Sequence, residues 1–84
     1  MRRNGLDICA DILEVARMGA RKTHIVYKAN LNFRIVERYL QRLMEGGLLE
    51  RRKGERLYVT TPEGLRFLER YRELTNPLYG GGRP

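Results

Sequence analysis

Arginine is the residue type with the clearest chemical capability in this sequence, since fourteen of its seventeen basic residues are arginines. A guanidinium group keeps its charge and donates paired hydrogen bonds to phosphate oxygens or to the O6 and N7 atoms of guanine. The excess charge is local, because residues 17–56 carry eleven basic and four acidic side chains. This localised positive field predicts a polyanionic partner. The alternative is a basic composition that serves solubility or reflects a thermophilic source.

The residue types that usually perform catalysis or bind metals are scarce. The sequence contains one cysteine, Cys9, one histidine, His24, and no serine. Two such ligands cannot complete a four-ligand structural zinc site, and one cysteine cannot form an internal disulfide. The acidic residues are scattered among arginines, so no cluster suggests a general acid, a general base or a nucleophile. We expect no enzymatic activity, no metal, no cofactor and no small-molecule effector, with Cys9 as a small buried residue.

The apolar pattern predicts four helices and one β-hairpin within a single small domain of 84 residues. Thr23, Asn32 and Thr61 are the expected N-caps, and Pro62 suits the first position of the last helix. Gly54 marks the turn between two strands. The predicted helices span 6–18, 24–29, 33–45 and 61–75, and the predicted strands span 48–53 and 56–60.

This order of elements (helix, helix–turn–helix, hairpin, helix) is the winged-helix plan, an α+β fold that is mainly α. Four segments of the sequence lie within these elements: DILEVA, KTHIVYKANLNF, YLQRLMEGGLLE and YVTTPEGLRFLERY. In these segments the chain resembles small archaeal winged helix-turn-helix DNA-binding proteins, which are predicted transcriptional regulators. The resemblance covers residues 6–75 and implies a three-helix core, a hairpin wing and a C-terminal dimerisation helix. We expect the domain to span residues 1–76 and residues 77–84 to be a flexible tail.

The helix over 33–45 is the expected recognition helix. Its outward face carries long hydrogen-bond donors, which a helix in the major groove needs in order to contact base edges. The alternative is a solvated basic face with local ion pairs, such as Glu37 with Arg38 or Arg42 with Glu45. The basic hairpin that follows this helix favours DNA. The expected base-contacting residues are Arg34, Arg38, Gln41 and Arg42.

Two further basic clusters are expected to bind DNA phosphates. The hairpin tip carries four positive charges that repel one another unless phosphates neutralise them, although charged hairpin edges also serve to prevent strand pairing. At the start of the second helix, basic side chains lie beside free backbone amides, and both favour a bound anion. Tyr27, Tyr39 and Tyr58 could stack on bases, but their spacing favours the edge of the core. The expected phosphate-contacting residues are Arg21, Lys22, Thr23, His24, Lys28, Asn32, Arg51, Arg52, Lys53 and Arg56.

The last helix carries more apolar residues than one buried face requires. Leu65 and Leu68 suit the domain core. A second stripe, spaced by four, three and four residues, has the a/d spacing of a coiled-coil seam. We therefore expect a homodimer that presents two recognition helices to half-sites roughly 34–36 Å apart, whereas one broad face packed on the first helix is the alternative. The expected dimer-interface residues are Phe67, Tyr71, Leu74 and Leu78.

Together these features predict a dimeric transcriptional regulator that reads the major groove with residues 32–45 and grips phosphates with residues 51–56. The alternatives are a winged-helix module that binds protein or RNA and a non-specific chromosome-coating protein. No apolar run approaches the roughly 20 residues of a membrane span. We expect a cytoplasmic, nucleoid-associated protein whose partners are double-stranded DNA and a second copy of itself.

Overall fold

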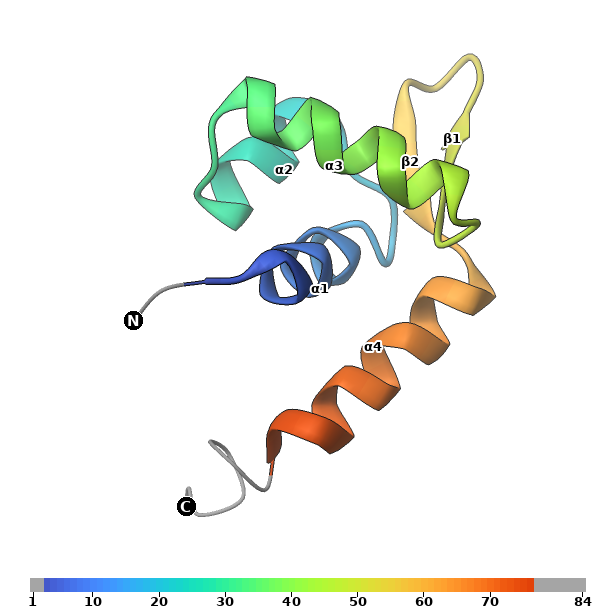
Figure 1. The fold of residues 1–84 in the computed structure, drawn as a ribbon. Coiled ribbons are helices and arrows are strands. Elements are labelled where there is room, and N and C mark those ends of the chain that lie inside the picture. Colours follow the sequence, from blue (N-terminus) through green and yellow to red (C-terminus); the bar gives the residue numbers. More distant parts are fainter. Residues whose placement is uncertain (1–2, 77–84) are drawn as a thin grey trace.

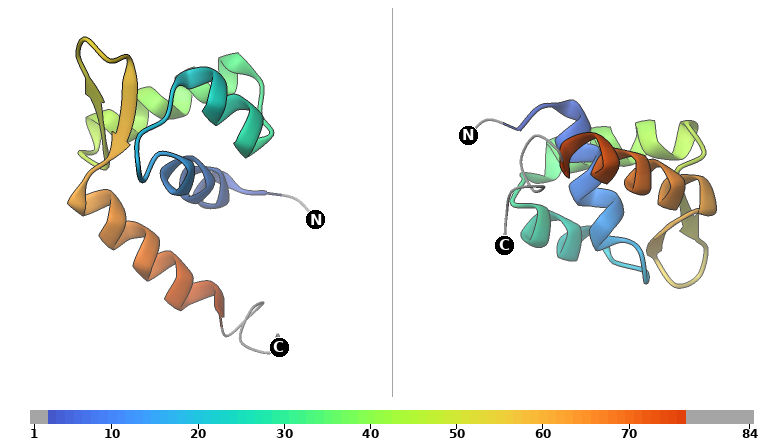
Figure 2. Two further views of the ribbon diagram at one scale, coloured as in Figure 1. Left: turned by 180° about the vertical axis from the view of Figure 1, so that it is seen from behind. Right: turned by 90° about the horizontal axis from the view of Figure 1, so that it is seen from below.

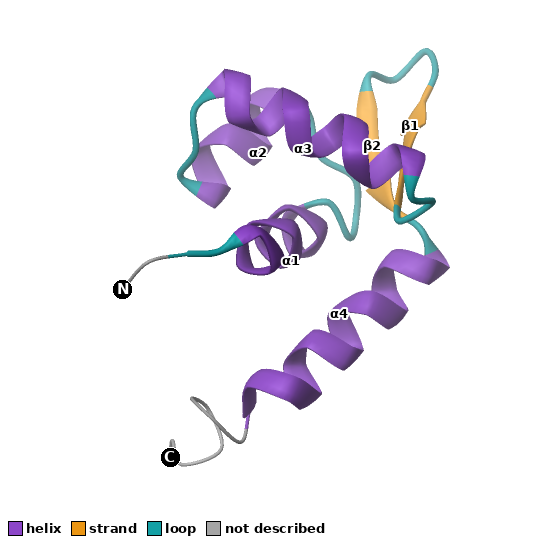
Figure 3. Cartoon of the chain, viewed as in Figure 1, coloured by secondary structure: helices purple, strands orange, loops and turns teal. Residues whose placement is uncertain are grey.

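A computed structural model describes residues 3–76, which form four helices and one two-stranded hairpin (Figures 1 and 3). This is the mainly helical α+β fold that the sequence predicts. In chain order the elements are α1 (Gly5–Val15), α2 (Lys22–Ala29), α3 (Phe33–Glu45), β1 (Leu49–Arg52), β2 (Leu57–Thr60) and α4 (Pro62–Thr75).

Helix α1 lies between the other helices. In Figure 1, α2 and α3 lie above α1 and α4 runs diagonally below it, while the hairpin rises beside the end of α3. Figure 2 shows α4 crossing α1 in the view from below, and the two helices are in contact. A single apolar core therefore joins all four helices and both strands. Its buried side chains are Ala10, Ile12, Leu13, Ala16, Ala20, Ile25, Ala29, Val36, Leu40, Leu43, Leu49, Tyr58 and Leu68.

The hairpin is fixed to the helical core by backbone pairing. β1 and β2 are antiparallel, with Arg51 opposite Tyr58. The backbone of Ala20, in the loop before α2, exchanges two hydrogen bonds of 2.9 and 2.8 Å with Tyr58 and so extends the sheet. The buried Thr60 hydroxyl donates a 2.6 Å hydrogen bond to the Leu13 carbonyl of α1. As a result, the start of α2 lies beside the hairpin, although the two are distant in the sequence.

Two of the predicted N-caps are confirmed. The Asn32 side-chain oxygen accepts a 2.8 Å hydrogen bond from the Ile35 amide, and the Thr61 hydroxyl accepts a 3.1 Å bond from the Gly64 amide. Pro62 occupies the first turn of α4, as expected. These side chains satisfy amides that have no partner within the first turn of a helix, so α3 and α4 begin where the sequence places them.

The prediction that Thr23 caps α2 is wrong. The helix begins at Lys22, and its N-cap residue is Arg21, which makes no side-chain capping bond. The reason is the pairing of Ala20 with Tyr58, which holds the chain extended up to Arg21 and lets the helical turn start directly after it. Thr23 is therefore inside the first turn of α2.

Helix α1 is shorter than the predicted span of 6–18, because it ends at Val15. The Ala16 carbonyl accepts a 3.0 Å hydrogen bond from the Thr60 amide of β2 and a 3.1 Å bond from the Gly19 amide. Gly19 then turns the chain with φ of +95°, a conformation that glycine adopts without steric cost. The contact with the hairpin thus replaces the last helical turn.

Helix α4 buries a narrower face than predicted. Leu68 is buried at 4% exposure, as expected, but Leu65 is 42% exposed, so its assignment to the core is wrong. The cause is the close approach of the first turn of α4 to the hairpin, where a Cβ on Gly64 would overlap the Leu48 carbonyl oxygen and the Thr60 methyl group. Gly64 and Leu68 stand four residues apart on this buried face, and Leu65 lies to its side.

Candidate nucleic-acid interface

Helix α3 presents a basic face on the outside of the molecule. Its apolar side chains Val36, Leu40 and Leu43 are buried in the core. At 100° per residue, the residues opposite this stripe fall within about 100° of arc. The structure therefore brings the predicted base-contacting residues together on one exposed helix face: Arg34, Arg38, Gln41 and Arg42.

The acids on α3 are bound by residues other than its exposed arginines. The Glu37 carboxylate accepts a 2.9 Å hydrogen bond from the Lys22 ammonium of α2, which holds the pKa of Glu37 below its ordinary value. The Glu45 carboxylate accepts a 3.1 Å bond from the side-chain amide of Gln41. The local ion pairs of the alternative interpretation are thus not formed. Across residues 3–76, the outward-facing guanidinium groups of α3 without an ion pair are those of Arg34, Arg38 and Arg42.

The predicted phosphate-contacting residues of α2 divide into two groups. Lys22 is half-buried and is held by Glu37, so its charge is partly neutralised. The others stand exposed along α2 or directly before it: Arg21, Thr23, His24 and Lys28. Asn32, the last predicted phosphate contact before α3, is exposed as well, but its side-chain oxygen is engaged as the helix cap.

Tyr27 is a candidate contact residue that the sequence interpretation considered for base stacking but assigned to the edge of the core. It is 85% exposed, so the expectation that it lies at the edge of the core is wrong. The buried residues of α2 are Ile25 and Ala29, four positions apart, and this spacing places Tyr27 on the opposite face. Tyr39 and Tyr58 do lie at the core, as expected. An exposed tyrosine next to His24 offers a ring and a hydroxyl to a neighbouring polar surface.

The hairpin separates its four cations onto different sides. Residues directly opposite each other in an antiparallel pair share a face, so Arg51 lies over Tyr58, with its guanidinium carbon 5.9 Å from the ring centroid. Arg52 pairs with Leu57 and lies on the other face. All four predicted residues of the wing are exposed, but they do not form a single cluster: Arg51, Arg52, Lys53 and Arg56.

The one cysteine and the one histidine lie on different helices, Cys9 on α1 and His24 on α2. Cys9 is half-buried against the core, and burial raises the pKa of its thiol. His24 is exposed on α2. Among residues 3–76, no three His, Cys, Asp or Glu side chains lie close enough together to hold a metal ion.

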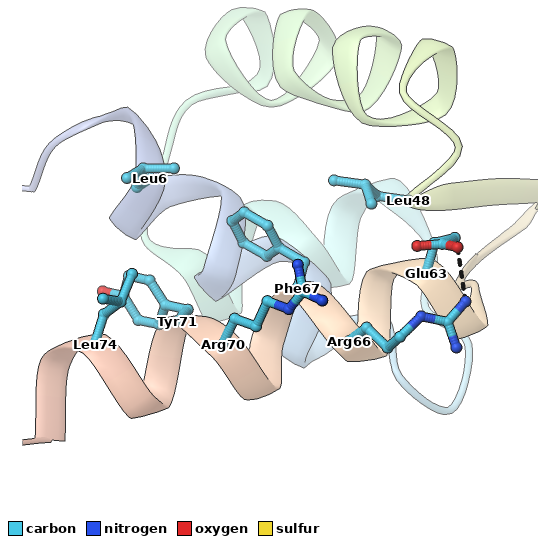
Figure 4. Close-up of a pocket in the computed structure, with 8 residues that line it drawn as sticks. All are labelled: Leu6, Leu48, Glu63, Arg66, Phe67, Arg70, Tyr71 and Leu74. Carbon is cyan, nitrogen blue, oxygen red and sulfur yellow. Dashed lines mark hydrogen bonds and ion pairs between the residues drawn. The ribbon is translucent and has the colours of Figure 1, made fainter.

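The predicted dimer seam lines an apolar groove between α4, α1 and the loop before β1. Phe67 and Tyr71 are half-buried against the core and stack on each other, with ring centroids 6.5 Å apart. Leu74 is 70% exposed in the isolated chain. Figure 4 shows these side chains with Leu6 and Leu48 around a hollow of about 270 Å³. Leu78, the fourth predicted interface residue, lies outside the described residues, as does the predicted tail 77–84.

Polar contacts hold α4 against α1 at the edge of this groove. The Tyr71 hydroxyl donates a hydrogen bond to the Asp7 carboxylate, which also accepts one from the Asn4 backbone amide. These two bonds hold the pKa of Asp7 below its ordinary value of 3.8. Further along, Arg72 of α4 forms a 2.6 Å ion pair with Glu14 of α1. The position of the groove therefore depends partly on carboxylates.

We expect replacement of Tyr71 by phenylalanine to make the protein less stable at neutral pH and less sensitive to acid. A carboxyl group whose pKa is lowered by folding stabilises the folded state above its unfolded pKa, and this contribution is lost as pH falls through the folded pKa. Without the Tyr71 hydroxyl, the pKa of Asp7 returns toward 3.8. The variant and the unaltered protein should therefore differ less in free energy of unfolding below about pH 4 than at neutral pH. Urea midpoints at pH 7 and pH 3 measure this.

The matched control for this experiment is Tyr39→Phe, because Tyr39 is also a half-buried tyrosine and its hydroxyl makes no hydrogen bond within residues 3–76. We expect this variant to keep the acid dependence of the unaltered protein. Equal acid dependence in all three proteins would contradict the role given to Asp7.

Three helices packed on one core, a paired hairpin after the third helix and a basic exposed face on that helix define the winged-helix class of proteins. This chain belongs to the winged helix-turn-helix family, since the sequence pattern of the family matches residues 2–78.

A solved structure with a similar fold is Sso10a-2, a DNA-binding protein from Sulfolobus solfataricus. The two chains are 24% identical, and the superposition covers 94% of this chain and 88% of that chain with a TM-score of 0.79. At this level of identity the likeness concerns the fold. None of the curated proteins compared with this chain is significantly similar to it in sequence. Within residues 3–76, no helix is both long enough and apolar enough to span a membrane.

Proposed function

We propose that this chain binds double-stranded DNA as a dimer and acts as a transcriptional regulator in the cytoplasm, associated with the nucleoid. The observation that carries the proposal is the outer face of α3, where three arginines are exposed without ion pairs between two further basic surfaces. Arginines on a groove-sized helix are suited to guanine edges, and flanking cations are suited to phosphates. The DNA-binding protein Sso10a-2, which shares the fold, supports this proposal.

The proposed dimer forms through the groove on α4. Leu74 leaves 70% of its surface exposed beside the half-buried rings of Phe67 and Tyr71. A second copy of α4 would cover these apolar groups. The rim of the groove carries Arg70 and a 2.7 Å ion pair between Glu63 and Arg66 (Figure 4). A two-fold dimer would place two α3 helices on successive turns of the same face of the duplex.

Duplex binding at two salt concentrations tests the proposal directly. We expect the protein to bind random-sequence duplex at roughly 50 mM salt, and we expect its affinity to fall by about a thousandfold at roughly 200 mM, because each neutralised phosphate releases counterions. Fluorescence anisotropy with a labelled 30-base-pair duplex measures both values. The absence of binding at low salt would overturn the proposal and favour a module that binds protein or RNA.

Two variants separate backbone contacts from base contacts. We expect Arg51→Ala combined with Arg52→Ala to weaken binding of all duplexes about equally and to reduce the salt slope by about 0.9 for each phosphate contact that is lost. Arg38→Ala should instead change the sequence preference, at a cost of about 1–3 kcal/mol for the preferred site. A uniform loss in the Arg38 variant would show that α3 does not read bases.

Selection of bound duplexes from a random pool distinguishes a regulator from a chromosome-coating protein. A regulator with the proposed geometry should enrich a palindrome whose half-sites are about 10 base pairs apart, or a multiple of this. A pool that shows no enrichment would favour coating of the duplex without sequence preference.

A further inference from the structure

A hollow of about 430 Å³ lies between the start of α2 and the hairpin. The pairing of Ala20 with Tyr58 creates it, because this pairing brings residues about 35 positions apart in the sequence onto opposite walls. The volume is many times the roughly 30 Å³ that one water molecule occupies in the liquid, so a hydrated phosphate group fits. The residues lining it are Arg21, Lys22, Thr23, Arg51, Arg56 and Tyr58.

Four of these six residues are cations, and none of the six is an acid. Lys22 is partly neutralised, since its ammonium lies 2.9 Å from the Glu37 carboxylate of α3. In the described part of the chain, the other three cations form no ion pair, and Arg51 is steadied by its position over the Tyr58 ring. Mutual repulsion of the remaining charges favours an anion between the walls.

Arg56 reaches this hollow from a strained backbone. Its φ is +56°, in the left-handed region that residues with a side chain rarely adopt, and Gly54 in the same turn has φ of +86°. Glycine would suit this conformation at position 56 better than arginine does. Strain of this kind concentrates at functional sites, where the side chain is needed and the surrounding structure holds it in place.

We infer that this hollow is a binding site for one phosphate of the DNA backbone, held jointly by Arg21 from the α2 side and Arg56 from the hairpin side. The inference rests on the proposed DNA-binding function and adds to it a single shared contact. Because both walls grip the same phosphate, binding locks the hairpin against the helix-turn-helix unit. The other cations of the hairpin, Arg52 and Lys53, do not line the hollow.

A salt series on duplex binding tests the shared contact. We expect Arg21→Gln and Arg56→Gln each to weaken binding about tenfold at low salt, as loss of a charge-assisted bond would. In the double variant the slope of log affinity against log salt should decrease by about 0.9, the value for one phosphate. A decrease of about 1.8 would mean two separate phosphates and would overturn the inference. Arg17→Gln is the matched control, because Arg17 pairs with Glu14 and lies outside the hollow. The duplex affinity of this variant should differ less than twofold from that of the unaltered protein.

Replacement of Arg56 by glycine separates function from stability. We expect Arg56→Gly to raise or preserve the thermal midpoint, because glycine relieves the positive φ, and to weaken duplex binding about tenfold, as Arg56→Gln does. Unchanged duplex affinity in Arg56→Gly would show that this side chain does not contact DNA and would overturn the inference.

Inorganic pyrophosphate tests the hollow without DNA. We expect saturable shifts of the backbone amide signals of Arg21, Thr23 and Arg56 in nuclear magnetic resonance spectra at millimolar pyrophosphate, and their loss in the double variant. Shifts spread evenly over all basic residues would overturn the inference, because they would show a diffuse charge effect. If the unaltered protein binds pyrophosphate in the hollow but binds no duplex, the proposed DNA-binding function fails while the anion site remains.

Discussion

Gly64→Ala is expected to lower the free energy of unfolding by about 3 kcal/mol, although alanine favours helix by about 1 kcal/mol over glycine. The added Cβ would overlap the Leu48 carbonyl oxygen and lie 2.6 Å from the Thr60 methyl carbon. That carbonyl accepts a 3.0 Å hydrogen bond from the Thr61 amide, so it cannot move away without loss of this bond. Helix α4 must instead move off the hairpin. Thermal denaturation should show a midpoint lower by roughly 10–25 °C.

Gly46→Ala is the matched control for this prediction. Gly46 follows α3 with φ of −83°, and the nearest atom to an added Cβ is the Arg42 carbonyl oxygen at 3.5 Å, an ordinary contact distance. We expect the free energy of unfolding of the Gly46→Ala variant to equal that of the unaltered protein or to exceed it by up to about 1 kcal/mol, since alanine restricts the unfolded chain. If Gly64→Ala were equally well tolerated, α4 would not approach the hairpin closely.

The features predicted correctly from the sequence depend on residues that are close together in the chain. Asn32 and Thr61 cap helices because each side chain reaches an amide three residues ahead. The buried stripe of α3 follows from a spacing of three and four residues. The exposed position of Arg34 and Arg38 follows from the same spacing, since the face opposite a buried stripe meets solvent.

The features that were predicted wrongly depend on contacts between distant parts of the chain. Thr23 is a good cap by type, but the pairing of Ala20 with Tyr58 starts α2 earlier. Leu65 is apolar and correctly spaced, but the approach of the hairpin to Gly64 turns the buried face of α4 away from it. No local pattern reports contacts of this kind.

The candidate site divides in the same way. The basic face of α3 could be predicted, because one helix contains it. The hollow between α2 and the hairpin could not be predicted, because Arg21 and Arg56 meet only once the sheet has formed. Tyr27 is an intermediate case. Its exposed position could have been predicted, because the four-residue spacing of Ile25 and Ala29 places the Tyr27 side chain opposite the core.

The second large effect is expected from Leu74→Glu, which should convert the proposed dimer to a monomer and weaken duplex binding at least a hundredfold. Leu74 is 70% exposed in the single chain, so a charge at this position costs the isolated protomer little. In a dimer seam the carboxylate would be taken out of water and the apolar contact of the leucine would be lost. Two linked half-site contacts exceed a single contact by roughly 10²–10⁴ in affinity, and monomerisation removes this gain. Sedimentation equilibrium and duplex titration measure the two effects.

Leu65→Glu is the matched control for this prediction. Leu65 is also an exposed leucine of α4, with 42% of its surface accessible, but it lies outside the groove that Leu74 lines. We expect Leu65→Glu to sediment at twice the mass of the chain and to bind duplex within about threefold of the unaltered protein, as a surface substitution away from an interface would. If both variants remain dimers, the interface lies elsewhere; if both become monomers, α4 pairs through the face that carries Leu65. Only dissociation of the Leu74 variant alone agrees with a seam formed by Phe67, Tyr71 and Leu74, because only that seam places the charge between two apolar surfaces.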